Sequence, residues 1–456
     1  MDFLHRTFKL HHRLVAGMLH IVFLSPHSDP EAHLGEPDSG GQCIYELQLG
    51  TALSGLPDIK VTTFCRQTFH RPDTSIINSS HTIRRIHCGP DTFIPKEEIE
   101  QYLLEFVTKV QQELKMCAET DTFIFHAHYW DGGLSALWLK NQCNDKIPLI
   151  WTPHSLGTLK RSKFLGEKNE DVYNFVPRLC WESYTSIAAD TIILSSESEK
   201  QALIDQYAVS AEKIVVNPPG VDFTTLVPSN RTKARQALGL PAAGRMLLCL
   251  GRMTRSKGYD RAIKALRALQ AVYSETIYLV ICGGSATSAS TEETVYLREL
   301  KQLTAELKVE KDVVFHPAVP HHKINLIFSA ADIFLMPSQH EPFGLVIIEA
   351  MGMKIPVVAS NVGGPAAIIQ HTQTGILVNF NDAERVASSI MALLKDTFFY
   401  TKIAAAAAKY ARKNFDWYHK AARFSQVYRS VSRLNHPENF HRWVESKFFL
   451  QQYFKV

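Results

Sequence analysis

The feature that most constrains the fold of this chain is an alternation, from end to end, of short apolar runs with stretches of helical periodicity. Short apolar runs bounded by turn residues are typical of buried strands, and helices between them imply parallel pairing. The pattern therefore predicts an α/β fold with parallel sheets. Two sets of strands are expected, at 19–24, 59–64, 123–126, 149–152 and 191–195 in the first half and at 246–250, 276–282, 312–315, 333–336 and 356–360 in the second.

A break between the two sets predicts two domains. The segment 217–222 reads Asn-Pro-Pro-Gly-Val-Asp, and its two prolines prevent it from extending a helix or a central strand. A chain of 456 residues is also too long for one hydrophobic core. We predict two Rossmann-like domains and two terminal pieces: an extension at 1–17, a first domain at 18–220, a second at 221–425, and a crossover helix with a tail at 426–456.

Charge and cysteine content exclude several classes of protein. The formal net charge is only +4 and the basic residues do not form one run, which argues against a nucleic-acid partner. No apolar run approaches the roughly 20 residues that a membrane-spanning helix needs. The eight cysteines include no Cys-x-x-Cys pair, as expected for reduced thiols. These features favour a cytoplasmic protein.

The two ends of the chain leave alternatives open. Residues 1–17 are basic and histidine-rich, and they are compatible with a surface helix, with an amphipathic segment that touches a membrane, or with an extension that has no role. The tail from Val431 is basic and aromatic. Packing onto the first domain is the preferred interpretation of the tail, and peripheral membrane contact through the termini is the alternative.

Two glutamates eight positions apart, Glu341 and Glu349, enclose a turn and the start of a helix. Pro342 and Gly344 bend the chain, and amides from Leu345 onward would face an anion or a sugar hydroxyl, assisted by the helix dipole. Glu349 then lies in an apolar helix, where a carboxylate is costly without a partner. The apolar surroundings of Glu349 therefore favour a functional role for this carboxylate over simple exposure to solvent.

Two more loops are candidates for binding anions. One follows a predicted strand and the other precedes a predicted helix. Arg252 and Lys257 lie five residues apart after the strand at 246–250, and they offer a planar guanidinium and a point charge to a phosphate. Gly40 and Gly41 stand before a helix and let main-chain amides close on an anion or a sugar. Either loop alone is common, but the joint occurrence of the basic loop with Glu341 and Glu349 argues against an ordinary solvated surface loop.

These segments resemble the signature of the retaining glycosyltransferases of family 4, over about residues 19–428. The resemblance implies the GT-B fold, in which two Rossmann-like domains face each other across a cleft and a C-terminal helix crosses back. It also implies that Glu341 meets the donor sugar, Glu349 holds the nucleotide ribose, and the basic loop binds the diphosphate. The implied donor site consists of Gly40, Gly41, Gln42, Arg252, Lys257, Gly344, Leu345 and Glu349.

Further segments are similar to the branch of sucrose-phosphate synthases and sucrose synthases: 34–47, 126–133 (HAHYWDGG) and 154–160 (HSLGTLK). In that resemblance His154 orients the donor hexose and stabilises the reacting centre without acting as a nucleophile. The implied catalytic residues are His154, Glu341, Arg252 and Lys257. Lysine and arginine positions that meet an acceptor phosphate match Lys96 and Arg178, and the implied acceptor site consists of Lys96, Tyr129, Ser155, Lys160 and Arg178.

Two features depart from that branch. Trp130 stands where the sucrose-phosphate synthases have a small residue, and a bulky ring there is expected to alter the acceptor. A tryptophan at this place occurs in the related inositol-phosphate glycosyltransferases. The segment 352–356 lacks the usual glycine two residues before the proline, which is expected to affect only a turn.

The histidines raise the question of a metal. His126 and His128 alternate at a strand end, but no carboxylate or cysteine stands at a ligand spacing from them, and the chain has no Asp-x-Asp triplet. We predict no metal and no cofactor, because the nucleotide sugar is a substrate.

The function that the resemblance implies is retaining transfer of a hexose. The expected donor is a nucleotide sugar, UDP-glucose first, and the expected acceptor is a small phosphorylated sugar such as fructose 6-phosphate. A second hypothesis keeps the donor and moves the acceptor to a lipid, glycan or inositol phosphate at a membrane surface. A third is a non-catalytic nucleotide-sugar-binding protein, against which the intact motifs argue.

Overall fold

The structure is a computed structural model. It describes residues 18–32, 36, 40–68, 71–115, 122–142, 147–164, 175–284, 291–339, 341 and 343–432. The predicted extension at 1–17, the tail from 433, part of the segment 34–47, and Pro342 lie outside the described residues.

The first domain is built on an eight-stranded sheet with the strand order β3-β4-β2-β1-β5-β6-β7-β8. All neighbouring strands are parallel except the edge pair β3 and β4. The five predicted strands are present, whereas β3, β4 and β8 were not predicted, because two are polar edge or near-edge strands and one is only three residues long. The strands are β1 (Leu19–Leu24), β2 (Ile59–Arg66), β3 (Thr74–Asn78), β4 (His81–Ile86), β5 (Thr122–His128), β6 (Leu149–Thr152), β7 (Thr191–Leu194) and β8 (Ile214–Val216).

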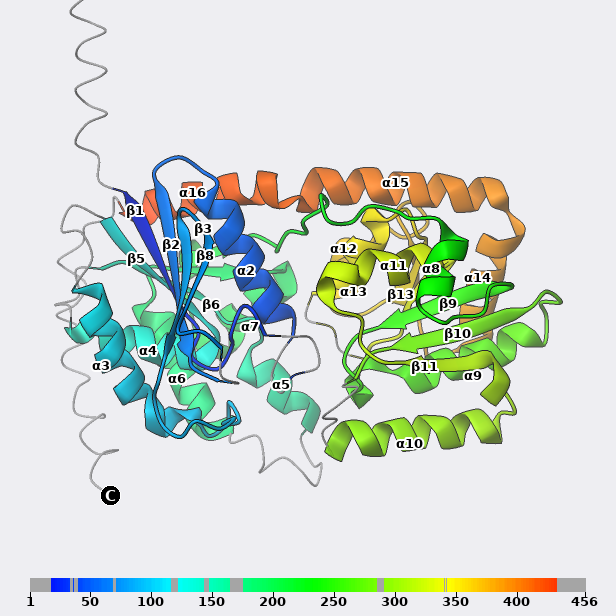
Figure 1. The fold of residues 1–456 in the computed structure, drawn as a ribbon, viewed down its shortest axis with the longest axis horizontal. Coiled ribbons are helices and arrows are strands. Elements are labelled where there is room, and N and C mark those ends of the chain that lie inside the picture. Colours follow the sequence, from blue (N-terminus) through cyan, green and yellow to red (C-terminus); the bar gives the residue numbers. More distant parts are fainter. Residues whose placement is uncertain are drawn as a thin grey trace, which may run out of the picture.

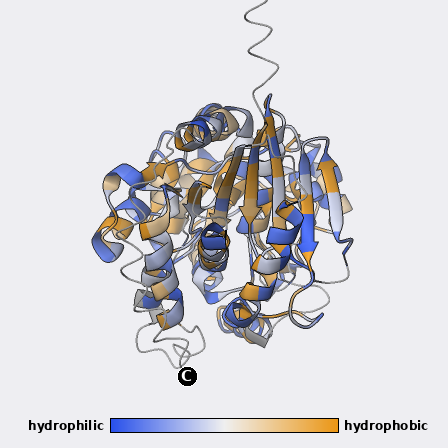
Figure 2. Cartoon of the chain, turned by 90° about the vertical axis from the view of Figure 1, so that its left-hand side faces the viewer, coloured by the Kyte–Doolittle hydropathy of each residue, from blue (hydrophilic) through white to orange (hydrophobic). Residues whose placement is uncertain are grey.

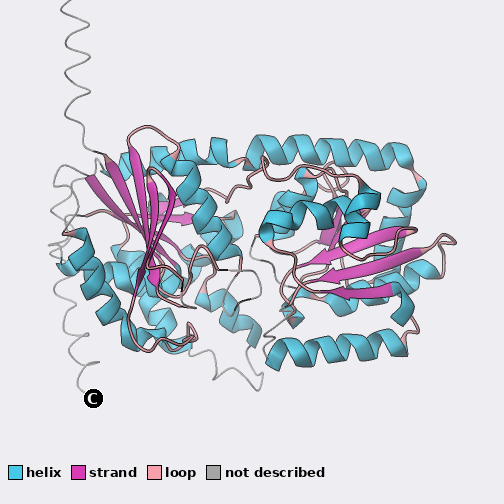
Figure 3. Cartoon of the chain, in the orientation of Figure 1, coloured by secondary structure: helices cyan, strands magenta, loops and turns pink. Residues whose placement is uncertain are grey.

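The second domain is built on a six-stranded sheet with the order β11-β10-β9-β12-β13-β14, and all its pairs are parallel. The five predicted strands are again present, and the short β14 was missed. Figure 3 shows the two sheets side by side, each covered by helices. The predicted α/β class with two parallel sheets is therefore confirmed. The strands are β9 (Arg245–Leu250), β10 (Ile277–Cys282), β11 (Val313–His316), β12 (Ile333–Met336), β13 (Val357–Ser360) and β14 (Ile376–Val378).

Helices connect the strands and cover both sheets (Figure 1). In the first domain they are α2 (Gly41–Ser54), η1 (Ile99–Tyr102), α3 (Leu103–Leu114), α4 (Tyr129–Gln142), α5 (Gly157–Phe164), α6 (Phe175–Ala188), α7 (Glu197–Tyr207) and η3 (Ala211–Lys213). The rest are α8 (Arg231–Ala237), η4 (Arg255–Lys257), α9 (Tyr259–Gln270), α10 (Thr291–Glu306), η5 (Glu310–Asp312), η6 (His321–Lys323), α11 (Ile324–Ala330), α12 (Leu345–Gly352), α13 (Gly364–Ile368), α14 (Ala383–Lys395), α15 (Thr397–Phe415) and α16 (Trp417–Ser432). Among the described residues, no helix combines the length and hydropathy that crossing a membrane requires.

Each sheet separates two hydrophobic clusters. In β1, Val22 and Leu24 belong to one cluster, while Ile21 and Phe23 belong to the cluster on the opposite face. This follows from the alternation of side chains along a strand, and a parallel sheet needs apolar residues on both faces because helices cover both. Figure 2 shows the result, with largely hydrophobic strands inside and hydrophilic helix surfaces outside.

The C-terminal helices join the two domains. In Figure 1, α15 runs along the second domain and α16 lies over the first. The return begins at Trp417, earlier than the predicted residue 426, because the indole, Phe424 and Tyr428 fill the cluster beneath α2. The indole Nε1 of Trp417 also donates a hydrogen bond to Gln48 Oε1 at 2.7 Å. Packing of α16 therefore couples the end of the chain to the first domain.

Candidate functional site

The glycine loops after β9 and β10 touch through their backbones. Gly251 has φ +150°, and a Cβ placed on Gly283 would lie 1.7 Å from the carbonyl oxygen of Gly251. No side chain fits between two backbones at that distance. The contact holds the start of the loop that carries Arg252 and Lys257.

Replacing Gly283 by alanine is therefore expected to lower the free energy of unfolding by about 3 kcal/mol or more, because the new methyl group meets backbone that has little freedom to move. Denaturant unfolding of the full chain measures the change. Gly40→Ala is the matched control, since no atom lies within 4 Å of a Cβ built at that position. Equal stability of the two variants would contradict the packing argument.

The basic loop is joined to the predicted donor glutamate by an ion pair. Lys257 closes the short helix η4, and its Nζ lies 2.5 Å from Glu341 Oε2. The two side chains retain only 17% and 12% of their exposure, so water screens the pair weakly. Arg252 lies exposed on the same loop. The structure thus pairs Lys257 with Glu341, and Arg252 lies five residues before Lys257 on the same loop.

Helix α12 begins beside this pair. Gly344 has φ +103° and precedes the first helical residue, Leu345, and Glu349 lies in the second turn with 4% of its surface exposed. A Cβ built on Gly41 of the first domain would lie 3.9 Å from Leu345 Cδ1. The glycine loop before α2 and the start of α12 therefore meet across the two domains, as the predicted donor site requires.

A second pair of glycines contacts the backbone of Glu341. This pair was not identified from the sequence. After β13, Gly363 has φ +69°, and the amide of Gly364 donates to the carbonyl oxygen of Glu341 at 2.8 Å. A Cβ on Gly363 would come within 2.9 Å of that oxygen. The Gly-Gly sequence after a predicted strand was the available signal.

Two residues at the carboxyl ends of neighbouring strands in the first domain have left-handed backbone conformations that non-glycine residues rarely adopt. Tyr129 follows β5 with φ +65°, and His154 follows β6 with φ +55°. Such conformations are energetically costly for residues other than glycine and concentrate at functional sites. Both lie at neighbouring carboxyl ends of the parallel sheet, where ligands of such sheets bind.

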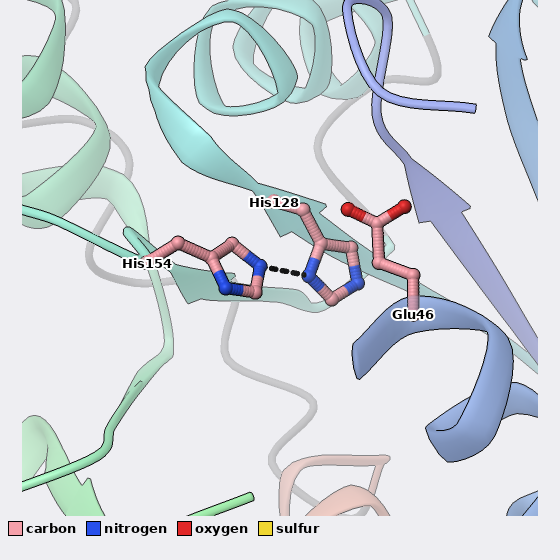
Figure 4. A group of neighbouring side chains, drawn as sticks. All are labelled: Glu46, His128 and His154. Atoms are coloured by element: carbon pink, nitrogen blue, oxygen red, sulfur yellow. Dashed lines mark hydrogen bonds between the residues drawn. The ribbon is translucent and has the colours of Figure 1, made fainter. Parts of the chain in front are cut away.

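His154, which is half-buried, lies beside two buried side chains, His128 and Glu46. The Nε2 of His154 lies 3.0 Å from the Nδ1 of His128, so one ring donates to the other. Figure 4 shows the two rings facing each other, with the side chain of Glu46 beside His128. Burial lowers the pKa of His154 to about 3 and the pKa of His128 well below its usual range. Both rings are therefore neutral and weakly basic at neutral pH.

Glu46 is a site residue that sequence reasoning missed. Its side chain is fully buried in α2, and burial raises its pKa well above the usual range, with nearby Asp131 and Asp29 acting in the same direction. Its Oε1 accepts hydrogen bonds from Ser25 Oγ at 2.7 Å and Gln42 Nε2 at 2.9 Å. The available signal was its position on the helix face that carries Leu49 and Leu53.

The predicted acceptor residues cluster around Arg178. This guanidinium is 5% exposed and donates to Tyr129 Oη at 2.7 Å, to Glu182 Oε1 at 2.7 Å and to the carbonyl oxygen of Ser155 at 2.9 Å. Burial lowers the pKa of Lys160 to about 8, and neighbouring positive charges act in the same direction: Arg178, Lys96 and Arg252. The five predicted residues therefore lie together, and the charge of Arg252 reaches them from the second domain.

Comparison with known proteins identifies the family. A family model described as Glycosyltransferase Family 4 matches residues 39–225, and one described as Glycosyl transferases group 1 matches residues 230–414. The mannosylfructose-phosphate synthase of Agrobacterium fabrum is 30% identical over 408 residues, which cover 87% of this chain and 88% of the relative. The chain belongs to the family 4 glycosyltransferases.

Two more comparisons extend this result. The D-inositol 3-phosphate glycosyltransferase of Xylanimonas cellulosilytica is 32% identical and the match covers 91% of this chain and 97% of the relative. Among solved structures, the sucrose-phosphate synthase of Thermosynechococcus elongatus is 30% identical, with a TM-score of 0.78 over 91% of this chain and 99% of that chain. The GT-B fold is thereby confirmed, and the non-catalytic hypothesis gives way to a glycosyltransferase.

In this glycosyltransferase Trp130 packs against residues on either side of Lys96, one of the predicted acceptor residues. Its side chain is 4% exposed and belongs to a cluster with Ile94 and Ile99, which flank Lys96 in the sequence. Its large ring therefore supports the segment that presents Lys96. An effect on the acceptor is expected through the position of this segment.

The structure corrects the sequence argument about metals. Glu46 does approach the histidines: ligand atoms of Glu46, His128 and His154 lie within 4.8 Å of one another. The group still fits a cation poorly, because burial raises the pKa of Glu46 and so disfavours the charged carboxylate that a cation needs, and because the two facing ring nitrogens bond each other. Independence from metal remains a prediction.

Proposed function

We propose that this glycosyltransferase moves a hexose from a nucleotide sugar, UDP-glucose first, to a small phosphorylated acceptor with retention of configuration. The observation that carries the proposal is the convergence of Lys96, Lys160 and Arg178 beside Tyr129 and Ser155. Clustered cations, one of them a buried guanidinium, suit a phosphate dianion. The names of the relatives agree with this chemistry, since each contains a phosphorylated sugar or inositol.

The second domain supplies the donor side of the proposal. Departure of a nucleoside diphosphate concentrates negative charge on its terminal phosphate, and Arg252 and Lys257 would neutralise that charge. The start of α12 would add main-chain amides and the helix dipole. Glu341 would hold the donor sugar and Glu349 the ribose.

The proposed mechanism is positioning combined with charge stabilisation. The acceptor hydroxyl attacks the face from which the diphosphate leaves, and a phosphate oxygen takes the proton. His154, with a pKa of about 3, is too weak a base to take it and orients the hexose instead. Exclusion of water between the domains would suppress hydrolysis of the donor.

The proposal has two candidates for the acceptor. Fructose 6-phosphate is the first candidate, in keeping with the resemblance to sucrose-phosphate synthases. An inositol phosphate is the second, favoured by Trp130 and by relatives named for D-inositol 3-phosphate. A membrane-bound acceptor would involve the termini, which lie outside the described residues.

A matrix of donors and acceptors, read by released nucleotide, tests the proposal. Release of UDP from UDP-glucose with fructose 6-phosphate, and not with fructose, is the expected result. Release with inositol phosphate instead would select the second candidate. Turnover that needs lipid vesicles, or that ignores the acceptor's phosphate, would refute a small phosphorylated acceptor.

Replacing Lys96 by alanine is expected to raise the KM for the acceptor about tenfold and to change the KM for the donor little, because one charge-assisted contact to phosphate is lost. Steady-state kinetics with each substrate varied in turn measure the two constants. Lys109→Ala is the control, since that lysine is exposed on α3 and pairs with Glu105. Equal changes in both constants would count against the acceptor pocket.

Removal of divalent metal is expected to leave the rate of transfer unchanged. The diphosphate is neutralised by Arg252 and Lys257 in this proposal, so no cation has to bridge it. The rate is measured after dialysis against EDTA and again after adding back Mg²⁺, Mn²⁺ or Zn²⁺. A loss that one of these ions restores would overturn metal independence.

A further inference from the structure

A carboxylate lies among the cations of the acceptor cluster. The Oε1 of Glu97 is 3.4 Å from Lys96 Nζ and 4.0 Å from Lys160 Nζ. The three side chains have exposed fractions of 20%, 21% and 24%, so each is accessible but partly shielded from water. One oxygen of Glu97 is therefore shared by two of the lysines that the proposed function assigns to the acceptor's phosphate.

A phosphate and the Glu97 carboxylate would compete for the same positive charges. Both are anions that accept hydrogen bonds from ammonium groups, and at separations of about 4 Å two negative charges repel by about 1 kcal/mol even in water. A nearby anion favours the charged form of Lys160. Burial and positive neighbours lower the pKa of this lysine, whereas Glu97 acts in the opposite direction. A bound phosphate would take over that role.

The fold of the segment does not depend on this carboxylate. The amide of Glu98 donates to the carbonyl oxygen of Pro95 at 2.8 Å, and Ile94 and Ile99 are buried on either side. Glu100 Oε1 accepts from the Trp181 indole at 3.0 Å. The neighbours of Glu97 thus hold the backbone in place, while its own ion pairs are partly exposed and contribute little stability.

We propose that Glu97 is a built-in competitor for the acceptor's phosphate. It balances the cationic cluster and has to give way when a phosphate binds, so it weakens the binding of phosphates in general. An acceptor then gains full affinity only through contacts made by its sugar or inositol ring. This inference rests on the proposed function, since it assumes that the cluster takes a phosphate.

Binding of inorganic phosphate to the full chain tests the inference. Isothermal titration calorimetry at about pH 6.5, below the pKa of Lys160, compares the wild type with Glu97→Gln. The variant is expected to bind phosphate about fivefold more tightly, in line with the removal of one like charge at this distance. It is also expected to have a lower KM for the phosphorylated acceptor. Glu98→Gln is the matched control, because it changes the same charge at the adjacent exposed position.

The outcomes separate the inference from the proposed function. Phosphate affinity that is unchanged or weaker in Glu97→Gln, or that rises equally in Glu98→Gln, overturns the role of Glu97. If Lys160→Ala nevertheless loses phosphate binding, the acceptor pocket stands and only the inference fails. If phosphate binds all variants equally, or binds none of them, both are overturned.

Discussion

Replacing Lys257 by alanine is expected to reduce kcat/KM for transfer about a hundredfold or more, which is the scale measured when one group that stabilises developing negative charge is removed. Its ammonium lies 2.5 Å from Glu341 in a pair that water screens weakly. The substitution removes a positive charge that would neutralise the leaving diphosphate. It also removes the ion-pair partner of Glu341, the glutamate that would hold the donor sugar. Steady-state release of nucleotide measures the effect.

The fold should survive this change, because Lys257 ends a short helix in which no residue is fully buried. The control is Lys264→Ala, which removes an exposed lysine on α9 that pairs with Asp260. An unfolding midpoint equal to that of the wild type would show that the loss is chemical. A Lys257→Ala variant that retains about a third of its activity would refute the diphosphate site.

Replacing Arg178 by alanine is expected to lower the free energy of unfolding by about 3 kcal/mol, because it leaves a buried carboxylate without its counter-charge. Glu182 is fully buried, and Arg178 Nε lies 2.7 Å from its Oε1. The guanidinium also holds Tyr129 and the loop of Ser155. Denaturant unfolding is the measurement, and loss of acceptor binding should accompany the loss of stability.

Two further variants make that prediction specific. Arg298→Ala removes an exposed arginine on α10 and is expected to leave the stability unchanged. Combining Arg178→Ala with Glu182→Gln should recover part of the stability, because the uncompensated charge is then absent. A single variant as stable as the wild type would mean that the hydrogen bonds from Gly157 and Tyr207 satisfy Glu182 by themselves.

Sequence reasoning succeeded where the physical cause is local. Apolar runs marked ten strands because a parallel strand covered on both faces must be apolar along its length. The turn at Gly344 and the helix after it were predicted from the local glycine and proline residues. The position of Glu349 one to two turns inside that helix was predicted in the same way. The three strands of the first sheet that were missed are short or carry polar residues at the sheet's edge, where that cause is weak.

The site was predictable only in part. Spacing and resemblance indicated Lys257 and Glu341, but their ion pair spans 84 positions and needs both strands β9 and β12 in place. Glu46 was missed because only folding brings α2 to the ends of β5 and β6. The hydrogen bond between Tyr428 and His126 spans 302 positions, and no local sequence pattern predicts it.

The sequence by itself determined the α/β class, the division into two domains, the order of the motifs and the family to which they belong. These depend on periodicity, turn residues and short motifs, which act over a few neighbouring positions. Only the tertiary structure decided where the chain returns to the first domain, that Glu46 joins the histidines, and that Glu97 lies between two lysines. The reason is that distance and burial, which set pKa values and the strength of ion pairs, exist only once segments far apart in the chain are packed together.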